Sequence, residues 1–266
     1  MFDMFNTLSF LSVSKADREM FERTAKERLR RRIESAVPWE PNTKFQDELN
    51  IKGDTFKSLS LWDVAPIDGA NPNSGDDSQL VISPEKQFCY CEKILPAGAS
   101  LNICSGSRKG SVIFDTPVVI PALHSRDHHC KDRIRWNPAP WMSITPMEII
   151  TLRPGTKAAR GDVIVAGLGL GHQLIEVSKK KSVKSIRLVE ISEELVNWVM
   201  PRIKPYLEKP VEVVIGRAIE VMPDMKADVA LIDVFKNYGN NNWARQAFVR
   251  ECKGIDKIWA WGSARI

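Results

Sequence analysis

The 266-residue sequence lacks a long hydrophobic run, a disulfide framework and a secretion signal. No apolar run approaches the ~20 residues that a membrane-spanning helix needs. Asp3 stands where a secretory signal would carry basic residues, so export is not expected. Five cysteines are an odd and scattered number, which favours reduced thiols. We therefore expect a cytoplasmic protein without a membrane partner.

The cysteines and histidines also lack the spacing of a zinc site. Structural zinc favours Cys pairs separated by ~2–4 residues on tight turns. Cys89 and Cys91 are instead separated by one residue, and Cys104 and the histidine-rich segment 124–130 follow at a distance. We interpret them as buried thiols and surface histidines, and we expect no metal.

The net charge is +5, and a basic balance can indicate nucleic-acid binding. The basic residues gather in two places. Arginines at 28–32 lie near the end of an expected N-terminal helix, and lysines at 179–184 lie in a turn before an expected strand. Solvated faces explain both clusters, so nucleic acid is left open as a partner but is not favoured.

An apolar run at 163–166 leads into three alternating glycines, Gly167, Gly169 and Gly171. A helical stretch follows, and a second apolar run, 185–190, ends on Glu190. The interval from the last glycine to Glu190 is about the 20 residues expected when a nucleoside lies across two adjacent parallel strands. Glycine lets a backbone approach a ligand closely, and a carboxylate can accept hydrogen bonds from ribose hydroxyls. The pattern predicts an adenosine-type cofactor.

The glycine spacing narrows the choice of cofactor. A dinucleotide site needs a small residue at the third position of G-x-G-x-x-G, and His172 stands there. The sequence has no G-K-[ST] triplet, which excludes a P-loop.

The rest of the chain continues the alternation of strands and helices. Further strands are expected at 211–215, 228–233 and 255–261, with helices at 173–180, 193–207, 219–225 and 243–252. This order predicts a parallel sheet with right-handed crossovers, whose ligands bind at the carboxyl ends of the strands. The glycines, Glu190 and Asp233 all fall at such ends.

From Trp141 to the C-terminus, the alternating glycines and the acid that ends the second strand resemble the class I S-adenosylmethionine-dependent methyltransferases, including their spermidine-synthase-like branch. The resemblance implies an α/β fold: a Rossmann-like parallel sheet of about five strands with helices on both faces. It also implies S-adenosyl-L-methionine as a small-molecule cofactor, with an unidentified acceptor.

The resemblance assigns roles to individual positions. The glycine turn would pack on the methionine part of the cofactor, Glu190 would hold the ribose, and Ile191 would lie on the adenine. The implied cofactor-binding residues are Ala166, Gly167, Leu168, Gly169, Gly171, Glu190, Ile191, Arg217 and Ala218. A plainer alternative for Glu190 is a carboxylate at a helix N-terminus, because Ser192 and Glu193 open the next helix.

The chain departs from the family pattern at three points. Arg217 stands where the family often has an adenine-binding acid, and arginine has no acceptor. Ala166 stands where an acid often leads the turn. The sequence ends on its fifth strand, whereas most members add two more, so the resemblance is to a shortened member, for which a phage or bacterial origin would fit. The N-terminal region or a second copy in a homo-oligomer would cover the edge.

Asp233 is the candidate catalytic base, and a capping residue is its alternative role. The run Asp233-Val234-Phe235-Lys236 differs from the [DNS]-P-P-[YFW] motif of enzymes that methylate DNA amino groups. Upstream, Thr145 is a good N-cap before Pro146, and Glu148 is either a first-turn acid or a site residue.

Three segments are expected: an N-terminal helical segment (1–38), a β-rich region (39–140) and a Rossmann-like cofactor domain (141–266). Strands in the second segment are expected at 87–95, 100–104 and 111–120. The function predicted is a methyltransferase of unknown acceptor. The alternatives are a non-catalytic binding or regulatory protein and a spermidine-synthase-like aminopropyltransferase.

Overall fold

A computed structural model of the chain describes residues 37–39, 61–62, 64, 67–68, 72–73, 79–96, 98–105, 108–114, 118–130, 134–235 and 241–263. The predicted N-terminal helix and its arginine cluster lie outside the described residues, as does most of the turn-rich linker at 70–78. The chain divides into two compact units. One combines residues 1–50 with 95–118, and the other combines 51–94 with 119–266.

The first unit contains a three-stranded sheet of order β1-β6-β5, formed by β1 (Val37–Trp39), β6 (Arg108–Phe114) and β5 (Ser100–Ser105). One prediction was wrong here. The strand expected at 111–120 is two strands, because β6 ends at Phe114 and β7 (Val118–Ser125) begins in a different sheet. Position 117 is a proline, which cannot donate to a strand ladder and so disfavours one continuous strand.

The second unit is built on a five-stranded parallel sheet of order β11-β10-β9-β12-β13. Its strands are β9 (Gly161–Ala166), β10 (Val183–Glu190), β11 (Val211–Ile215), β12 (Ala227–Ile232) and β13 (Ile255–Ala260). This confirms the predicted Rossmann-like sheet. The order turns back between β9 and β12, which is where such sheets place their ligands.

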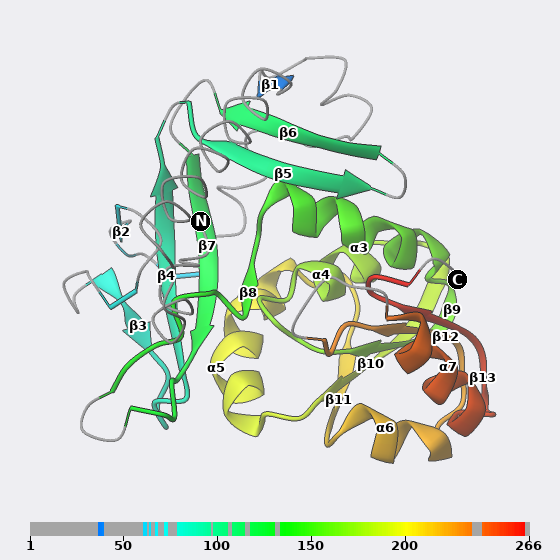
Figure 1. Cartoon of the computed structure of the whole chain (residues 1–266). Helices are drawn as coiled ribbons and strands as arrows, with labels where there is room; N and C mark the ends of the chain where they lie inside the picture. The colour runs from blue at the N-terminus through cyan, green and yellow to red at the C-terminus, as the bar shows by residue number, and fades with distance from the viewer. Residues whose placement is uncertain are drawn as a thin grey trace, which may run out of the picture. The chain divides into compact units, whose positions relative to one another are not determined.

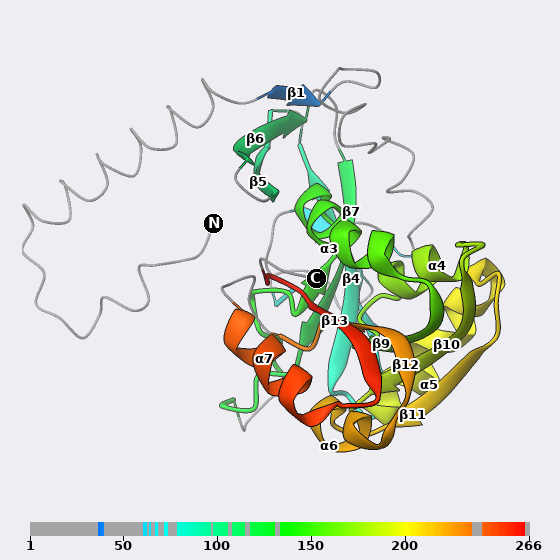
Figure 2. The ribbon, with the colours of Figure 1, turned by 90° about the vertical axis from the view of Figure 1, so that its right-hand side faces the viewer.

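Helices cover both faces of this sheet (Figures 1 and 2). They are α3 (Pro146–Ala158), α4 (His172–Ser178), α5 (Glu193–Ile203), α6 (Ala218–Val221) and α7 (Asn242–Glu251). On one face, Met222 and Phe248 bury against Ile164, Ala230 and Ile258. On the other face, Gly155 of α3 lies directly against the Trp259 ring, which leaves no space for a Cβ.

Local sequence signals set the helix ends. Thr145 caps α3, since its Oγ1 accepts from the Glu148 N–H at 3.2 Å, and Ser192 caps α5 by accepting from the Leu195 N–H at 3.1 Å. The helices expected at 193–207 and 219–225 end earlier and continue as the 3₁₀ turns η5 (Lys204–Tyr206) and η6 (Met222–Asp224). Pro205 and Pro223 lie in the first positions of these turns, where the missing proline N–H leaves no helix hydrogen bond unmade.

A second sheet precedes α3, with the order β2-β4-β7-β8 and β3 paired on β4. Its strands are β2 (Ile67–Asp68), β3 (Val81–Ile82), β4 (Phe88–Leu95), β7 and β8 (Met142–Ser143). Trp62 joins it to α5, because its ring lies 4.5 Å from those of both Tyr90 and Trp198. The predicted boundary at residue 141 stays a prediction.

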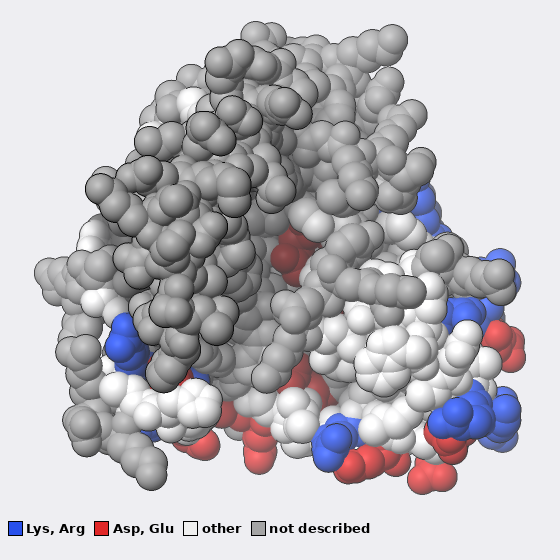
Figure 3. Space-filling model, in the orientation of Figure 1, with Lys and Arg blue, Asp and Glu red and all other residues white. Residues whose placement is uncertain are grey.

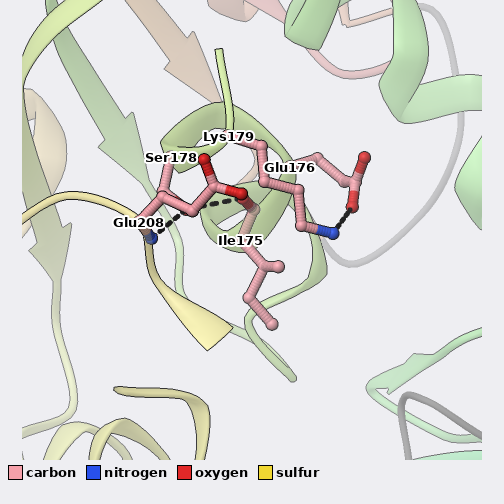
Figure 4. A network of polar contacts seen from close by, with 5 residues as sticks. All are labelled: Ile175, Glu176, Ser178, Lys179 and Glu208. Atoms are coloured by element: carbon pink, nitrogen blue, oxygen red, sulfur yellow. Dashed lines mark hydrogen bonds and ion pairs between the residues drawn. The ribbon is translucent and has the colours of Figure 1, made fainter. Parts of the chain in front are cut away.

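The lysine-rich turn after α4 lies at the amino ends of the strands, opposite the predicted site. Figure 4 shows Ser178, whose Oγ donates to the Ile175 carbonyl at 2.7 Å and accepts from the Glu208 N–H at 3.1 Å. Lys179 forms an ion pair with Glu176 at 2.7 Å. In Figure 3, the described Lys and Arg residues are interspersed with Asp and Glu on the face in view. No helix within the described residues has the length and apolarity to span a bilayer.

Candidate functional site

A cavity of about 570 Å³ opens at the carboxyl ends of the parallel strands. Its wall includes the turn after β9, the residues after β10 and β11, and Asp233 after β12. This volume falls in the range of ~300–1,000 Å³ that small-molecule sites occupy. Parallel topology alone brings these segments together, since all four strands end at the same edge of the sheet.

Backbone conformation and contacts within the protein explain why the turn has glycine at three positions. Gly167, Gly169 and Gly171 have φ values of +99°, +51° and +81°, which favour glycine. A Cβ at these positions would collide with the Asp233 carbonyl oxygen, the Met142 sulfur and the Ile203 side chain, respectively. The glycines were expected to admit a ligand, but contacts within the protein already require them.

The turn residues differ in their access to the cavity. Gly167, Leu168 and Gly169 line it. Ala166 is fully buried at the end of β9, and Gly171 is the N-cap of α4; neither is among the lining residues.

Glu190 is both a structural and a cavity-lining residue. Its Oε2 accepts from the Leu168 N–H at 2.8 Å, and its Oε1 accepts from the Ser192 N–H at 3.0 Å. The residue is only 6% exposed. An ionised carboxylate has about four lone-pair positions, so each oxygen keeps capacity for another donor in the cavity. Glu190 can therefore fix the turn and still receive hydrogen bonds from a ligand.

Two carboxyl groups lie together elsewhere in the cavity wall. Asp233 follows β12, and Glu148 comes from the first turn of α3. Burial raises the pKa of Asp233 to about 7. Burial and the neighbouring Asp233 hold the pKa of Glu148 well above its usual range. Both shifts favour the neutral carboxyl, whereas a cation bound beside the pair would favour the ionised form.

The remaining predicted residues, which are Ile191, Arg217 and Ala218, also line the cavity. Arg217 is largely exposed and pairs with Glu220 at 3.3 Å. Ala218 is buried, and Ile191 is 58% exposed beside Glu190. The loop 236–240 expected after Asp233 lies outside the described residues.

Sequence reasoning missed several lining residues. Trp141, Trp243 and Trp261 all border the cavity, with Trp243 73% exposed. Trp261 donates its indole N–H to Thr151 Oγ1 at 2.9 Å. A usable signal existed for Trp261, which directly follows a strand. Gln173 and Met142 also line the cavity. Gln173 lies at the start of a helix and Met142 lies in a two-residue strand, and neither position has a sequence pattern that indicates a binding site.

Within the described segments, no group of three or more His, Cys, Asp or Glu side chains is arranged to hold a metal ion. Cys89 and Cys91 are buried in the core with Ala122 and Trp136. Burial raises the pKa of the Cys91 thiol to about 11.

Comparisons with known proteins give no family model and no curated protein that matches this chain. Solved structures with partial likeness include a putative RNA methyltransferase from Pyrococcus horikoshii, with 18% identity over 47% of this chain and 65% of that one, at a TM-score of 0.35. Trm5b from Pyrococcus abyssi matches with 15% identity over 59% of this chain and 44% of its own, at a TM-score of 0.33. TrmK from M. capricolum, in complex with S-adenosyl-homocysteine, matches with 11% identity over 39% of this chain and 47% of its own, at a TM-score of 0.32.

This chain spans less than two thirds of the length of the first solved structures that it matches.

Proposed function

We propose that the protein binds S-adenosyl-L-methionine and is methyltransferase-like, with an acceptor still to be identified. One observation carries the proposal. A single cavity at the switch point of a parallel sheet contains Glu190, the glycine turn and the Glu148–Asp233 carboxyl pair. These are an acceptor for ribose hydroxyls, a backbone surface and two carboxyls whose ionised form a cationic ligand would favour.

The adenosine half would lie along Glu190 and the residues that follow β11. The free acceptor positions of Glu190 suit the two ribose hydroxyls, and Ile191 offers an apolar surface to the adenine. Arg217 cannot accept from the adenine amino group, so recognition of that group needs a different acceptor.

The other half of the cavity suits transfer chemistry. A bound sulfonium supplies a methyl group for in-line displacement, in which alignment provides much of the rate. In this proposal Asp233 would take the proton that an acceptor loses, and its pKa of about 7 is near the optimum for a general base at neutral pH.

The aminopropyltransferase alternative gains one observation. The sequence suggested too few acids for it, but the structure adds Glu148 to Asp233 in the same cavity. An amine-bearing donor without a carboxylate would also suit this pair. The two alternatives differ in whether the site recognises a carboxylate.

Calorimetry with S-adenosylmethionine and S-adenosylhomocysteine tests the proposal. We expect the full-length chain to bind both, and Glu190→Gln to weaken binding by about tenfold or more, the typical effect of altering a hydrogen bond to a charged group. Glutamine keeps one acceptor oxygen for the Leu168 N–H, so the turn is disturbed less than by alanine.

Glu212→Gln is the matched control, because the carboxylate of Glu212 is 68% exposed on β11 and is not among the cavity-lining residues. Absence of binding to the unmodified chain at millimolar ligand would contradict the proposal.

A further inference from the structure

Gln173 is a polar residue that the fold itself leaves unexplained. It lies in the first turn of α4, directly after the glycine turn, and lines the cavity. The residue is 6% exposed, and its side-chain amide nitrogen is buried without a hydrogen-bond partner among the described residues. Buried donors in native proteins are almost always satisfied, so this amide points to a missing acceptor.

Glu148 supplies the complementary group. It lies on α3, which packs against α4, and its carboxyl lines the same cavity. Its side chain makes no hydrogen bond or ion pair within the described residues. A donor from one helix and an acceptor from its neighbour thus line the same cavity.

These two groups match the two charges of an α-amino acid. An amide N–H donates to a carboxylate, and a carboxylate accepts from an ammonium group. Ala166, at the end of β9, has no side-chain acceptor for the ammonium, whereas the carboxyl of Glu148 on α3 lines the cavity and accepts no other hydrogen bond from the described residues.

We propose that Gln173 and Glu148 recognise the zwitterionic amino-acid end of the ligand, with Gln173 donating to its carboxylate and Glu148 accepting from its ammonium. This inference rests on the proposed function and deepens it. It implies that the site requires a ligand that carries a carboxylate, and it therefore argues against a decarboxylated aminopropyl donor.

Three ligands separate the contributions. S-adenosylhomocysteine has both charges, its decarboxylated analogue S-adenosyl-3-thiopropylamine has only the ammonium, and 5′-methylthioadenosine has neither. We expect the full-length chain to bind the first about tenfold or more tightly than the second, the usual effect of one hydrogen bond to a charged group. Calorimetry of all three ligands measures this ratio.

Gln173→Met keeps the length of the side chain and removes the donor. It should reduce the ratio between the first two ligands to within about twofold while leaving the affinity for 5′-methylthioadenosine unchanged. Glu148→Gln should weaken both ammonium-bearing ligands about equally. Gln246→Met is the control, because Gln246 is exposed on α7 and does not line the cavity.

Gln173→Glu provides a second test if the methionine variant folds poorly. Its carboxylate would repel the carboxylate of S-adenosylhomocysteine and attract the amine, so the preference should reverse. If the unmodified chain binds none of the three ligands, the proposed function and this inference fail together. If it binds them but neither Gln173 variant changes the ratio, the inference alone is wrong.

Discussion

Asp233 is a single side chain whose surroundings change its proton affinity. Its pKa is about 7 in the folded chain and about 3.8 for the unperturbed group. Between these values the folded state binds more protons than the unfolded state, so the free energy of unfolding decreases as pH rises. The destabilisation is complete above the folded pKa, and it is absent below the unfolded one.

Asp233→Asn should therefore flatten the pH dependence of stability. We expect the unmodified chain to lose stability relative to the variant between about pH 4 and pH 7, as measured by urea unfolding at several pH values. Part of the slope should remain in the variant, because the pKa of Glu148 is raised in the same direction. Asp256→Asn, at an exposed position in β13, is the control. Parallel curves for Asp233→Asn and the unmodified chain would contradict the assignment.

At this scale, the sequence predicted positions better than contacts. Glu190 and Asp233 were expected at strand ends because parallel strands finish at one edge of a sheet. The hydrogen bonds that Glu190 accepts from the Leu168 and Ser192 N–H groups depend on the exact path of the turn, which the residue types do not specify. The pairing of Glu148 with Asp233 depends on how α3 packs, which is a long-range property.

The turn between β9 and α4 has a shape that depends on glycines, which have no side chain. Gly167 combines a φ of +99° with a close approach to the Asp233 backbone, which occupies the space that a Cβ would need. A methyl group there would have to displace the end of β12, where the candidate base lies. The position of this turn and the position of the end of β12 therefore depend on each other.

Gly167→Ala should lower the free energy of unfolding by about 2–4 kcal/mol, the sum expected from an unfavourable φ and from overpacking. Gly98→Ala is a close control, since Gly98 has a φ of +82° and no atom lies within 4 Å of the place that its methyl group would take. It should cost only about 1–2 kcal/mol. Urea unfolding of both variants checks this. Equal losses would mean that the contact with Asp233 contributes nothing.

Most elements of the second unit were predictable from local patterns. All five strands of the parallel sheet were expected because each is an apolar run bounded by turn residues. The Thr145 cap was expected for the same reason of local chemistry, and its contact with the Glu148 N–H confirms it. The single strand expected at 111–120 was wrong, because the apolar pattern continues past Pro117 although a proline disfavours one continuous strand.

For the whole molecule, ligand binding should appear as added stability. A ligand that binds only the folded chain contributes about 2.7 kcal/mol at 100 times its Kd. For a chain of this size we expect a rise of several degrees in Tm with saturating S-adenosylhomocysteine, measured by thermal unfolding. ATP is the control, because the sequence has no G-K-[ST] triplet to bind a phosphate chain and the cavity lining includes three carboxyl groups, those of Glu148, Glu190 and Asp233. An equal rise with ATP would contradict this selectivity.

The positions of Trp141, Trp243 and Trp261 have a practical consequence. The chain has 8 tryptophans, and these three border one cavity. A planar or charged guest would change the polarity and quenching around a substantial share of the indoles at once. The intrinsic fluorescence of the protein is therefore a label-free reporter of occupancy, suited to screening candidate acceptor molecules one after another.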